Sequence, residues 1–545
     1  MNMRGRKAGV FLSLSLLAGS VSAAGPMPSA SPAGPVLIFL VDTLRPDRMS
    51  VYGAPHATTP ALADLAREGV VFDRAYAHSS WTRASVGTLF TSLLPAAAGT
   101  LDRNGLLDPA VATLPQLFHD RGFKTAAFVG NVNVSKRTGF GRGFDVFESV
   151  EAVEPGLEAS PRARTVVDPA VRFVESQQSS RFFLYVHVMD PHQPLNLEPA
   201  SRALFVEATA DPKPDPREDQ FLDYDRAIRQ ADDQFARLVA TLRAKGFWDH
   251  ATVIYTSDHG EEFYEHGGRG HGNTLFEEQI RVPLVLKLPI GRGTTSRRQE
   301  IVSLADVVPT LSELYALPRD PSWIGSSLLA PLPSRPLFFT EDVDGNRLYA
   351  IRAGTRKLVV SLYPKLDERL YDLSRDAGEK QGTEIACGAR PPEEDRGLFA
   401  ALETWRLRDV SAFPRIDFEK TGVGAVRFIL TMALPDSHRT FLTFGDYCRC
   451  RPYIRATALF LAADVPASEA YRLSVATDAQ GSIPTYRLAV YDASGNPVAG
   501  KRRDALFQSR RVERPRLSEA EPEDEIKKLR SLGYLGGAPQ ARKRP

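Results

Sequence analysis

The sequence predicts an α/β protein, a three-layer α/β/α sandwich with a large and mostly parallel sheet, followed by a smaller C-terminal β-rich subdomain. Uninterrupted apolar runs, such as VLIFLV at 36–41, are typical of parallel strands that are covered on both faces. Such runs alternate with helical patterns up to about residue 335. Shorter strands follow over 336–373, and an alternating, aromatic pattern over 425–495 favours a small antiparallel unit.

Composition and the N-terminal segment bear on where the protein works. The net charge of +2 gives no reason to expect a nucleic-acid partner. Three basic residues precede the apolar run 8–18, and small residues at 22–24 offer a cleavage site. This pattern predicts a signal peptide over 1–24 rather than a membrane anchor, because the run is too short to span a bilayer. We therefore expect a periplasmic or secreted protein with no transmembrane helix in the mature chain.

The first elements of the predicted sheet lie before residue 100. Strand 36–41 ends at Asp42. The segment 59–69 begins with Thr-Pro and ends with Gly, which are the start and stop signals of a helix, and 70–72 is a short strand. Strand 36–41 therefore delivers a carboxylate at its carboxyl end.

A second helix is predicted over 84–94, where apolar residues recur at helical spacing. Thr82 and Ser85 fall at its amino end, where free N–H groups favour an anion. Thr82 is either the N-cap of this helix or a nucleophile. Both roles need a hydroxyl at that position, so the pattern alone leaves the two open.

The middle of the chain repeats the alternation of strand and helix. The predicted elements are helices at 113–121, 168–178, 218–245 and 303–316 and strands at 124–129, 182–187, 252–256 and 282–287. Three of these strands lead into polar side chains, namely Asn131, His192 and the pair Asp258 and His259. Because the carboxyl ends of parallel strands share one sheet edge, these side chains would gather there with Asp42. Asp and His ligands on such an edge predict a metallohydrolase.

The loop 257–276, SDHGEEFYEHGGRGHGNTLF, carries the densest local signal. It holds three of the ten histidines in the chain, which makes an incidental polar surface loop the weaker interpretation. His266 is expected to order the loop around His271, and Arg45 to brace the turn after Asp42. The remaining acidic residues of the loop are expected to face solvent or to brace it, and they are Glu261, Glu262 and Glu265.

Seven motifs together resemble the sulfatase branch of the alkaline-phosphatase superfamily over roughly residues 35 to 380. They are VDTLRPDRMSVYG, TPALADLAREGVVFDRAYA, WTRASVGTLFTSLLP, DPHQP, TSDHGEEFYEHGGRGHGNTLFEEQIRVPLV, ADVVPTLSEL and LYDLSRDAGE, in family order. The resemblance implies an alkaline-phosphatase-like α/β/α domain, a divalent metal ion, and a covalent intermediate on a side chain that lies over the metal.

The expected domain organisation combines this resemblance with the sequence patterns. It consists of a signal peptide at 1–24, a spacer at 25–34, a catalytic α/β domain at 35–335, a C-terminal sulfatase subdomain at 336–384, an unmatched β-rich extension at 385–510, and a helix with a disordered tail at 511–545. The three cysteines all lie late in the chain. In an exported protein, Cys387 is expected to pair with Cys448 or Cys450.

The chain departs from the sulfatase pattern at the nucleophile. Sulfatases carry Cys or Ser in C/S-x-P/A-x-R, which is oxidised to formylglycine. The equivalent residue here is Thr82, which is no substrate for that maturation, and Val86 replaces the arginine. Four other family positions also differ. Asn131 and Asn133 replace the Lys and His of the family's G-K-W-H segment, His271 replaces a late Lys, and Thr43 replaces the second Asp of an Asp-Asp pair.

With these departures, the site resembles that of family relatives that transfer phosphoryl groups, namely phosphoethanolamine transferases, lipoteichoic-acid synthases and nucleotide phosphodiesterases. The resemblance implies one or two divalent ions (Zn, Mn or Ca), with the ligands Asp42, Thr82, Asp258 and His259. Thr82 would be the catalytic nucleophile. Groups implied to bind the substrate are Ser85, Arg83, Asn131, His192 and His271, the two histidines also being candidates for protonating the leaving oxygen.

The resulting prediction is an exported, metal-dependent hydrolase or transferase of the sulfatase family that cleaves a phosphate ester or diester through Thr82. Its substrate would be anionic, such as an ester on an envelope glycan or lipid. One alternative is a sulfuric ester hydrolase that works without formylglycine, and another is a non-catalytic relative that binds a polyanion. Arg83 would pair with the substrate or lie on the surface. His187, on an apolar strand, is interpreted as a core histidine rather than a ligand.

Overall fold

The computed structural model describes most of the chain between residues 34 and 512. The predicted signal peptide, the three cysteines with their expected disulfide, and the predicted C-terminal helix lie outside the described residues. Within the span, the residues left out are 102, 104, 151–159, 206–215, 294, 344–347, 362–366, 386–391, 411–414, 421–425, 434–439, 445–452, 456–457, 466–471, 478–485, 493 and 501–506.

An eight-stranded sheet forms the centre of the larger part of the molecule, in the order β10-β2-β9-β6-β1-β5-β3-β4. Strand β9 is antiparallel to β6 and β2, and the other pairings are parallel. The strands are β1 (Val36–Val41), β2 (Val70–Tyr76), β3 (Lys124–Val129), β4 (Val146–Ser149), β5 (Phe182–Val188), β6 (Thr252–Thr256), β9 (Arg281–Lys287) and β10 (Ser296–Ser303).

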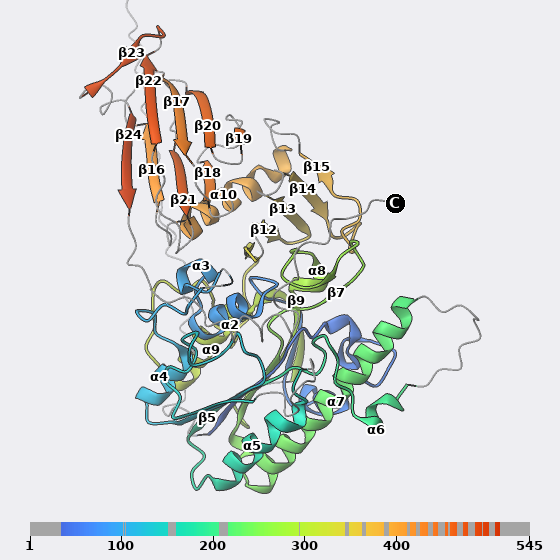
Figure 1. Cartoon of the computed structure of the whole chain (residues 1–545). Helices are drawn as coiled ribbons and strands as arrows, with labels where there is room; N and C mark the ends of the chain where they lie inside the picture. The colour runs from blue at the N-terminus through green and yellow to red at the C-terminus, as the bar shows by residue number, and fades with distance from the viewer. Residues whose placement is uncertain are drawn as a thin grey trace, which may run out of the picture.

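Helices cover both faces of this sheet (Figure 1). One face packs against α1 (Pro60–Ala66), α5 (Ala163–Ser176) and α7 (Pro216–Ala244), and the other against α2 (Thr82–Thr91), α4 (Leu114–Asp120) and α9 (Val307–Tyr315). Side chains of β1 alternate between the two hydrophobic cores, Ile38 facing one and Phe39 the other. Burying a side chain of this size contributes up to about 1.5–3 kcal/mol, so a continuously apolar strand is stable only in this central position.

A second, antiparallel sheet follows, with the order β11-β12-β13-β14-β15. Helix α10 (Arg396–Val410) lies against it through Leu398, Phe399 and Leu402. The strands are β11 (Leu337–Glu341), β12 (Leu348–Ala353), β13 (Arg356–Ser361), β14 (Asp367–Asp372) and β15 (Thr383–Glu384). This sheet packs beside the large one and reaches its carboxyl edge.

Two more antiparallel sheets lie beyond α10, at the top of Figure 1. One has the order β18-β21-β16-β24, with the bounds Thr440–Phe444, Arg472–Thr477, Arg415–Lys420 and Phe507–Val512. The other has the order β19-β20-β17-β22-β23, with the bounds Tyr453–Arg455, Ala458–Val465, Val426–Ala433, Tyr486–Asp492 and Pro497–Val498.

The predicted fold class is therefore confirmed: a mixed α/β domain with a large, mostly parallel sheet and separate antiparallel sheets after it. Strand β2 is longer than the three residues expected, because its polar second half pairs with β9 and β10 across a bulge. Helix α2 spans Thr82–Thr91 rather than 84–94, and its N-cap is Trp81, so the interpretation of Thr82 as the N-cap is wrong. Among the described residues, none of the helices combines the length and apolar character that crossing a membrane requires.

Candidate active site

Four polar side chains meet at the carboxyl edge of the large sheet and are shielded from solvent. Asp42 follows β1 directly, and Asp258 and His259 come two and three residues after β6, the strand next to it. Thr82 is the first residue of α2. All four side chains are fully buried. Thr43, between Asp42 and the following turn, has a φ of 54°, a left-handed conformation that is costly for a non-glycine residue.

Each of the two carboxylates uses one oxygen for the protein and leaves the other without a hydrogen-bond partner among the described residues. Asp42 Oδ2 accepts from Asn131 Nδ2 at 2.5 Å and from His187 Nε2 at 3.0 Å. Asp258 Oδ1 accepts from the backbone N–H of Thr43 at 3.3 Å and of His259 at 3.0 Å. The remaining oxygens are Asp42 Oδ1 and Asp258 Oδ2. A buried carboxylate oxygen without a donor is costly unless a cation binds it.

His259 is the third residue of this set, and its Nε2 lies 3.4 Å from Asp258 Oδ2. Its Nδ1 lies 2.9 Å from the carbonyl oxygen of Gly260, to which it donates, so that Nε2 is left as an acceptor or metal ligand. Asp42, Asp258 and His259 each offer one ligand atom, and these atoms all lie within 4.8 Å of one another. We call these three residues the metal cluster. Two carboxylates and an imidazole suit a hard-to-borderline divalent ion such as Zn²⁺ or Mn²⁺, so the residues present fit the expected metal.

Thr82 stands beside the metal cluster. Its Oγ1 lies 3.1 Å from His259 Nε2 and accepts from Asn131 Nδ2 at 3.3 Å. The segment before it is held by Glu341 of β11, which accepts from Ser79 Oγ at 2.7 Å and from the backbone N–H of Ser80 at 2.9 Å. The second sheet therefore helps to fix the position of Thr82 at the helix end, where the dipole favours an anion.

His192 and His271 lie beside this cluster. The His271 ring centroid is 4.3 Å from that of His259 and 5.1 Å from that of His192. Burial lowers the pKa of His192 to about 4. Burial and the neighbouring His259 ring lower the pKa of His271 to about 3. Both rings are therefore neutral at pH 7 in the free protein.

Electrostatics differ between the two carboxylates of the cluster. Burial opposes ionisation of Asp42, but the His187 hydrogen bond and the nearby His192 outweigh it, so the pKa of Asp42 lies well below its usual range. Burial and the charge of Asp42 raise the pKa of Asp258. Burial would lower the pKa of His259, yet Asp258 and Asp42 raise it. A divalent cation beside the two carboxylates would favour their ionised forms.

Two predicted substrate-binding residues make other contacts. Ser85 Oγ donates to the carbonyl oxygen of Ser79 at 2.8 Å, which uses its only proton. Arg83 is 1% exposed, so the expectation of a surface role is wrong. Its guanidinium donates to the carbonyl oxygens of Arg103 and Gly105 and to Asn133 Oδ1. Arg83 thus braces the loop beside the site from the first turn of α2.

Asn131 and His187 enter the site in ways that the sequence did not indicate. The amide of Asn131 bridges Asp42 and Thr82, which makes it a brace for the site as well as a candidate substrate contact. His187 was expected to be a core histidine, and its ring is indeed buried, but its Nε2 lies against Asp42. The pairing register of β5 with β1 could have indicated this contact. His187 lies opposite Leu40, close to the strand end that carries Asp42.

Of the three loop glutamates, Glu261 and Glu262 are buried and Glu265 is partly exposed. Glu261 is 1% exposed, and its Oε1 lies 3.3 Å from His271 Nδ1. Burial raises the pKa of Glu261 to about 7. Glu265 accepts from Arg45 Nη1 at 2.6 Å, so Arg45 ties the turn after Asp42 to this loop. Glu262 Oε1 accepts from the backbone N–H groups of His266 and Gly268, which agrees with the expectation that it braces the loop.

Glu262, His266 and Glu278 form a second group of ligand-type residues whose atoms lie within 4.8 Å of one another. We call these three residues the loop clamp. His266 Nδ1 lies 2.7 Å from Glu278 Oε1, and His266 Nε2 lies 3.1 Å from the carbonyl oxygen of Gly378. The His266 ring also stacks on Phe276 with a centroid separation of 3.7 Å. The clamp therefore ties the histidine-rich loop to the chain segment after β14.

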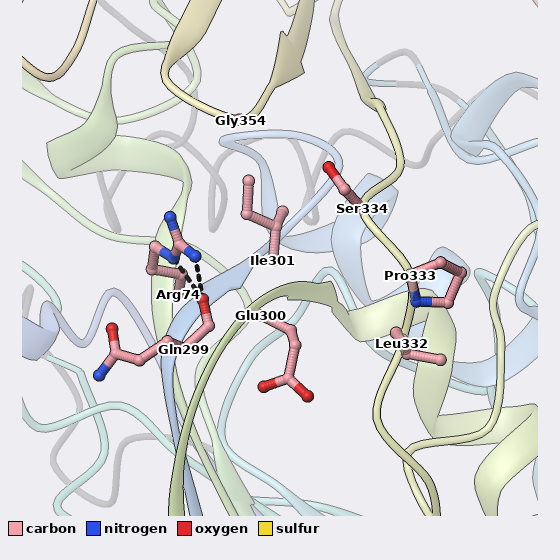
Figure 2. A pocket seen from close by; sticks show the side chains of 8 residues that line it. All are labelled: Arg74, Gln299, Glu300, Ile301, Leu332, Pro333, Ser334 and Gly354. Carbon is pink, nitrogen blue, oxygen red and sulfur yellow. Dashed lines mark hydrogen bonds between the residues drawn. The ribbon is translucent and has the colours of Figure 1, made fainter.

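A separate cavity of about 350 Å³ lies at the edge of the large sheet (Figure 2). Arg74 of β2 donates there to the carbonyl oxygen of Gln299 of β10, and Gly354 is another lining residue. The cavity offers one carboxylate, Glu300, which accepts from Arg298. This arrangement has no grouped nucleophile, base and metal ligands, so it does not compete with the metal cluster as an active site.

Comparisons with known proteins agree with this geometry. A family model described as Sulfatase matches residues 35–316. The N-acetylgalactosamine-6-sulfatase of Sus scrofa is 27% identical over 405 residues, which cover 62% of this chain and 74% of the relative.

Solved structures show the same fold. A protein in complex with its substrate D-glucosamine-2-N,6-O-disulfate matches with a TM-score of 0.59 and 18% identity, over 70% of this chain and 98% of that one. The phosphonate monoester hydrolase of Agrobacterium radiobacter matches with a TM-score of 0.55 and 20% identity, over 70% of this chain and 95% of that one.

A buried Asp, Asp and His cluster lies on the carboxyl edge of a sheet whose fold these solved structures share. The matched region covers more than half of the chain, and the protein belongs to the sulfatase family. Enzymes of this family use a divalent metal ion, for which the metal cluster supplies candidate ligands.

Proposed function

We propose that this protein cleaves a phosphate ester or diester by phosphoryl transfer through Thr82, and that it does so as an exported enzyme. The observation that carries the proposal is the position of Thr82 Oγ1, 3.1 Å from His259 Nε2 and at the amino end of α2. A hydroxyl in this place can attack an electrophilic centre bound beside the metal cluster. Threonine cannot become formylglycine, which favours a direct attack by its own oxygen.

The residues around Thr82 suit this role. A bound divalent ion would lower the pKa of the Thr82 hydroxyl and neutralise charge on the transferred group. Asn131 donates to one lone pair of Oγ1 and thereby orients the hydroxyl. Attack forms the bond from Oγ1 to phosphorus and breaks the bond to the leaving oxygen, and water then hydrolyses the threonyl phosphate or an acceptor takes the phosphoryl group. The free N–H groups at the start of α2 favour the charge that develops.

His192 and His271 would bind the transferred group as neutral donors. Each imidazole is uncharged at pH 7 because burial lowers its pKa, and His192 offers its one N–H to a phosphoryl oxygen. His271 would do so from Nε2 while its Nδ1 accepts from protonated Glu261, whose pKa burial raises to about 7. A bound anionic substrate would raise both pKa values, since an opposite charge favours the imidazolium form. The proton for the leaving oxygen would then become available only in the substrate complex.

Sulfate-ester hydrolysis is the second candidate function, and family membership favours it. The relative from Sus scrofa is named as a sulfatase, and one structural neighbour was solved with a sulfated sugar as its substrate. In this alternative, the same metal cluster would bind a sulfate ester and Thr82 would act without oxidation. The physiological substrate under either proposal is an anionic ester of an envelope glycan or lipid, met by an enzyme that resides in the periplasm or is secreted.

Turnover of matched chromogenic esters separates the two functions. Purified protein with Zn²⁺ or Mn²⁺ would be assayed on p-nitrophenyl phosphate, bis-p-nitrophenyl phosphate and p-nitrophenyl sulfate. We expect phosphate or diester turnover, reduced on the order of 10⁴-fold in Thr82→Ala and partly retained in Thr82→Ser. Sulfate turnover that survives in Thr82→Ala, without phosphate turnover, would contradict the proposal.

A further inference from the structure

Asp42 is the ligand of the metal cluster whose orientation depends on other side chains. Asp258 Oδ1 accepts from backbone N–H groups of its own turn at 3.0 Å and of Thr43 at 3.3 Å, with a longer contact of 3.5 Å from Ser257 Oγ. His259 is held by the carbonyl oxygen of Gly260. The shortest of these contacts come from main-chain groups, which substitutions do not remove. Asp42 Oδ2, in contrast, is held by the side chains of Asn131 and His187, so its orientation can be changed by mutation.

We infer that His187 is a positioning residue, which turns Asp42 so that its Oδ1 faces the metal, and that Tyr185 fixes His187 in turn. The inference rests on the proposed metal-binding role of the cluster. His187 Nε2 lies 3.0 Å from Asp42 Oδ2, and His187 Nδ1 lies 3.0 Å from the hydroxyl of Tyr185. Neither Tyr185 nor His187 is exposed to solvent.

The sheet register sets up this relay. In the parallel pairing of β1 with β5, Leu40 lies opposite His187, and the backbone N–H of Asp42 donates to the carbonyl oxygen of Val188 at 2.9 Å. Tyr185 comes two residues before His187 in the same strand and therefore points to the same face of the sheet. Its ring packs edge-on against Phe90 of α2, with centroids 4.9 Å apart.

The hydrogen-bond chemistry assigns a direction to the relay. An ionised carboxylate can only accept, so His187 Nε2 carries a proton and donates it to Asp42 Oδ2. Tyr185 then donates from its hydroxyl to His187 Nδ1. This fixes the tautomer and the plane of the imidazole, as second-layer partners of metal ligands do. Asp42 Oδ1, which has no hydrogen bond among the described residues, is left for the cation.

His187 is a cleaner probe of this positioning than Asn131. Asn131 Nδ2 also lies 3.3 Å from Thr82 Oγ1, so its substitution would disturb the nucleophile as well. The side-chain hydrogen bonds of His187 recorded in the described part of the chain go to Tyr185 and Asp42. A change at His187 should therefore alter metal affinity through Asp42 alone.

Zn²⁺ affinity, measured by competition with a chromophoric chelator, tests the inference without relying on turnover. We expect His187→Phe and the shorter His187→Asn to bind Zn²⁺ about 10–100-fold more weakly than the wild type. His187→Gln, whose amide can reach Asp42 in place of Nε2, should restore most of that affinity. Tyr185→Phe should lose less, about threefold to tenfold, because the imidazole remains.

The matched control is Val186→Ala, which truncates a buried side chain on the other face of the same strand. It should lower the melting temperature and leave the Zn²⁺ affinity unchanged. Wild-type affinity in folded His187→Asn, or a loss as large in Val186→Ala, would overturn the positioning role. Asp258→Asn distinguishes a failure of the positioning role from a failure of the metal site. Wild-type Zn²⁺ affinity in Asp258→Asn would overturn both the metal site and the positioning role. A loss of affinity in Asp258→Asn with no loss in His187→Asn would overturn the positioning role alone.

Discussion

The metal cluster and the loop clamp have similar compositions and opposite hydrogen-bonding states. Each contains two carboxylates and one histidine with ligand atoms within 4.8 Å. In the metal cluster, Asp42 Oδ1 and Asp258 Oδ2 have no donor among the described residues. In the loop clamp, Glu262 accepts from the backbone N–H groups of His266 and Gly268 and from Gln279 Nε2.

The histidines of the two groups differ in the same way. Both ring nitrogens of His266 face acceptors, so the clamp suits a protonated imidazolium, and the Glu278 contact raises the pKa of His266 although burial opposes this. His259 donates from Nδ1 to a backbone carbonyl oxygen, and its Nε2 lies between two site residues, 3.1 Å from Thr82 Oγ1 and 3.4 Å from Asp258 Oδ2. Composition and proximity alone therefore do not define a metal site. A metal site also needs ligand atoms that have no protein donor, as is the case for Asp42 Oδ1 and Asp258 Oδ2 among the described residues.

The largest expected effect is on metal binding. Its absence would contradict the distinction between the metal cluster and the loop clamp. Asp258→Asn removes one of the two anionic ligands, and we expect Zn²⁺ affinity to fall by more than about 100-fold, with loss of activity. Glu278→Gln alters the clamp by the same chemical change and should shift Zn²⁺ affinity by less than about threefold. Titration calorimetry and elemental analysis of both variants provide the measurement.

Equal losses of bound metal in Asp258→Asn and Glu278→Gln would contradict the distinction between the two groups. A second equivalent of Zn²⁺ that disappears only in Glu278→Gln would show that the clamp itself binds metal.

His78 contrasts with His266, because it is a buried histidine with no carboxylate partner in the described part of the chain. Its Nδ1 lies 2.6 Å from the carbonyl oxygen of Phe338, and burial lowers its pKa to about 4. The folded protein therefore resists protonation, while the unfolded chain takes up a proton below a pKa of about 6.5. The free energy of unfolding should fall as the pH drops from about 6.5 to 4, by up to about 3 kcal/mol from this residue.

His78→Asn keeps a donor near the position of Nδ1 and removes the titration. Chemical denaturation at pH 7 and pH 4.5 should show a smaller loss of stability for this variant than for the wild type. An equal loss in both proteins would contradict a neutral His78.

The smallest expected effect concerns the clamp at alkaline pH. The pKa of His266 is raised, so its contribution is fully present below about pH 6.5 and is lost as the pH rises through the folded value. The ion pair is partly exposed to solvent, and we expect at most about 1 kcal/mol. Hydrogen exchange of the segment 262–276, corrected for intrinsic rates, should rise between pH 6 and pH 9.

The control for the clamp is His266→Gln, which should exchange this segment at the same corrected rate at both pH values. A wild-type segment that is equally protected at pH 6 and pH 9 would show that the imidazolium does not hold the loop.

Much of the architecture follows from local sequence pattern. The uninterrupted run at 36–41 has no stable place except the centre of a covered sheet, and the predicted edge of polar strand ends is where Asp42, Asp258 and His259 lie together. The loop motif and the family resemblance also led to the sulfatase family, which the comparisons confirm. The roles of individual site residues remain predictions.

Residues that act across strands were harder to predict. An apolar strand predicts burial of His187 but not the neighbour that its ring meets, which depends on strand order and register. A solvent-facing role was one of two expectations for both Glu261 and Arg83, because most charged residues are exposed. Only the fold shows that both are buried, with Glu261 beside His271 and Arg83 against a loop backbone. Glu341 reaches the Thr82 segment from a separate sheet, a contact that no local pattern encodes.

The central claim is that Thr82 carries the transferred group, and trapping the covalent intermediate tests it most directly. The metal-loaded enzyme would be mixed with a phosphate diester, quenched in acid during turnover, digested and mapped by mass spectrometry. The proposed function predicts one phosphoryl group on the peptide that contains Thr82, and none in Thr82→Ala. Turnover with an unmodified Thr82 peptide under the same quench, or a phosphoryl group on another residue, would contradict it.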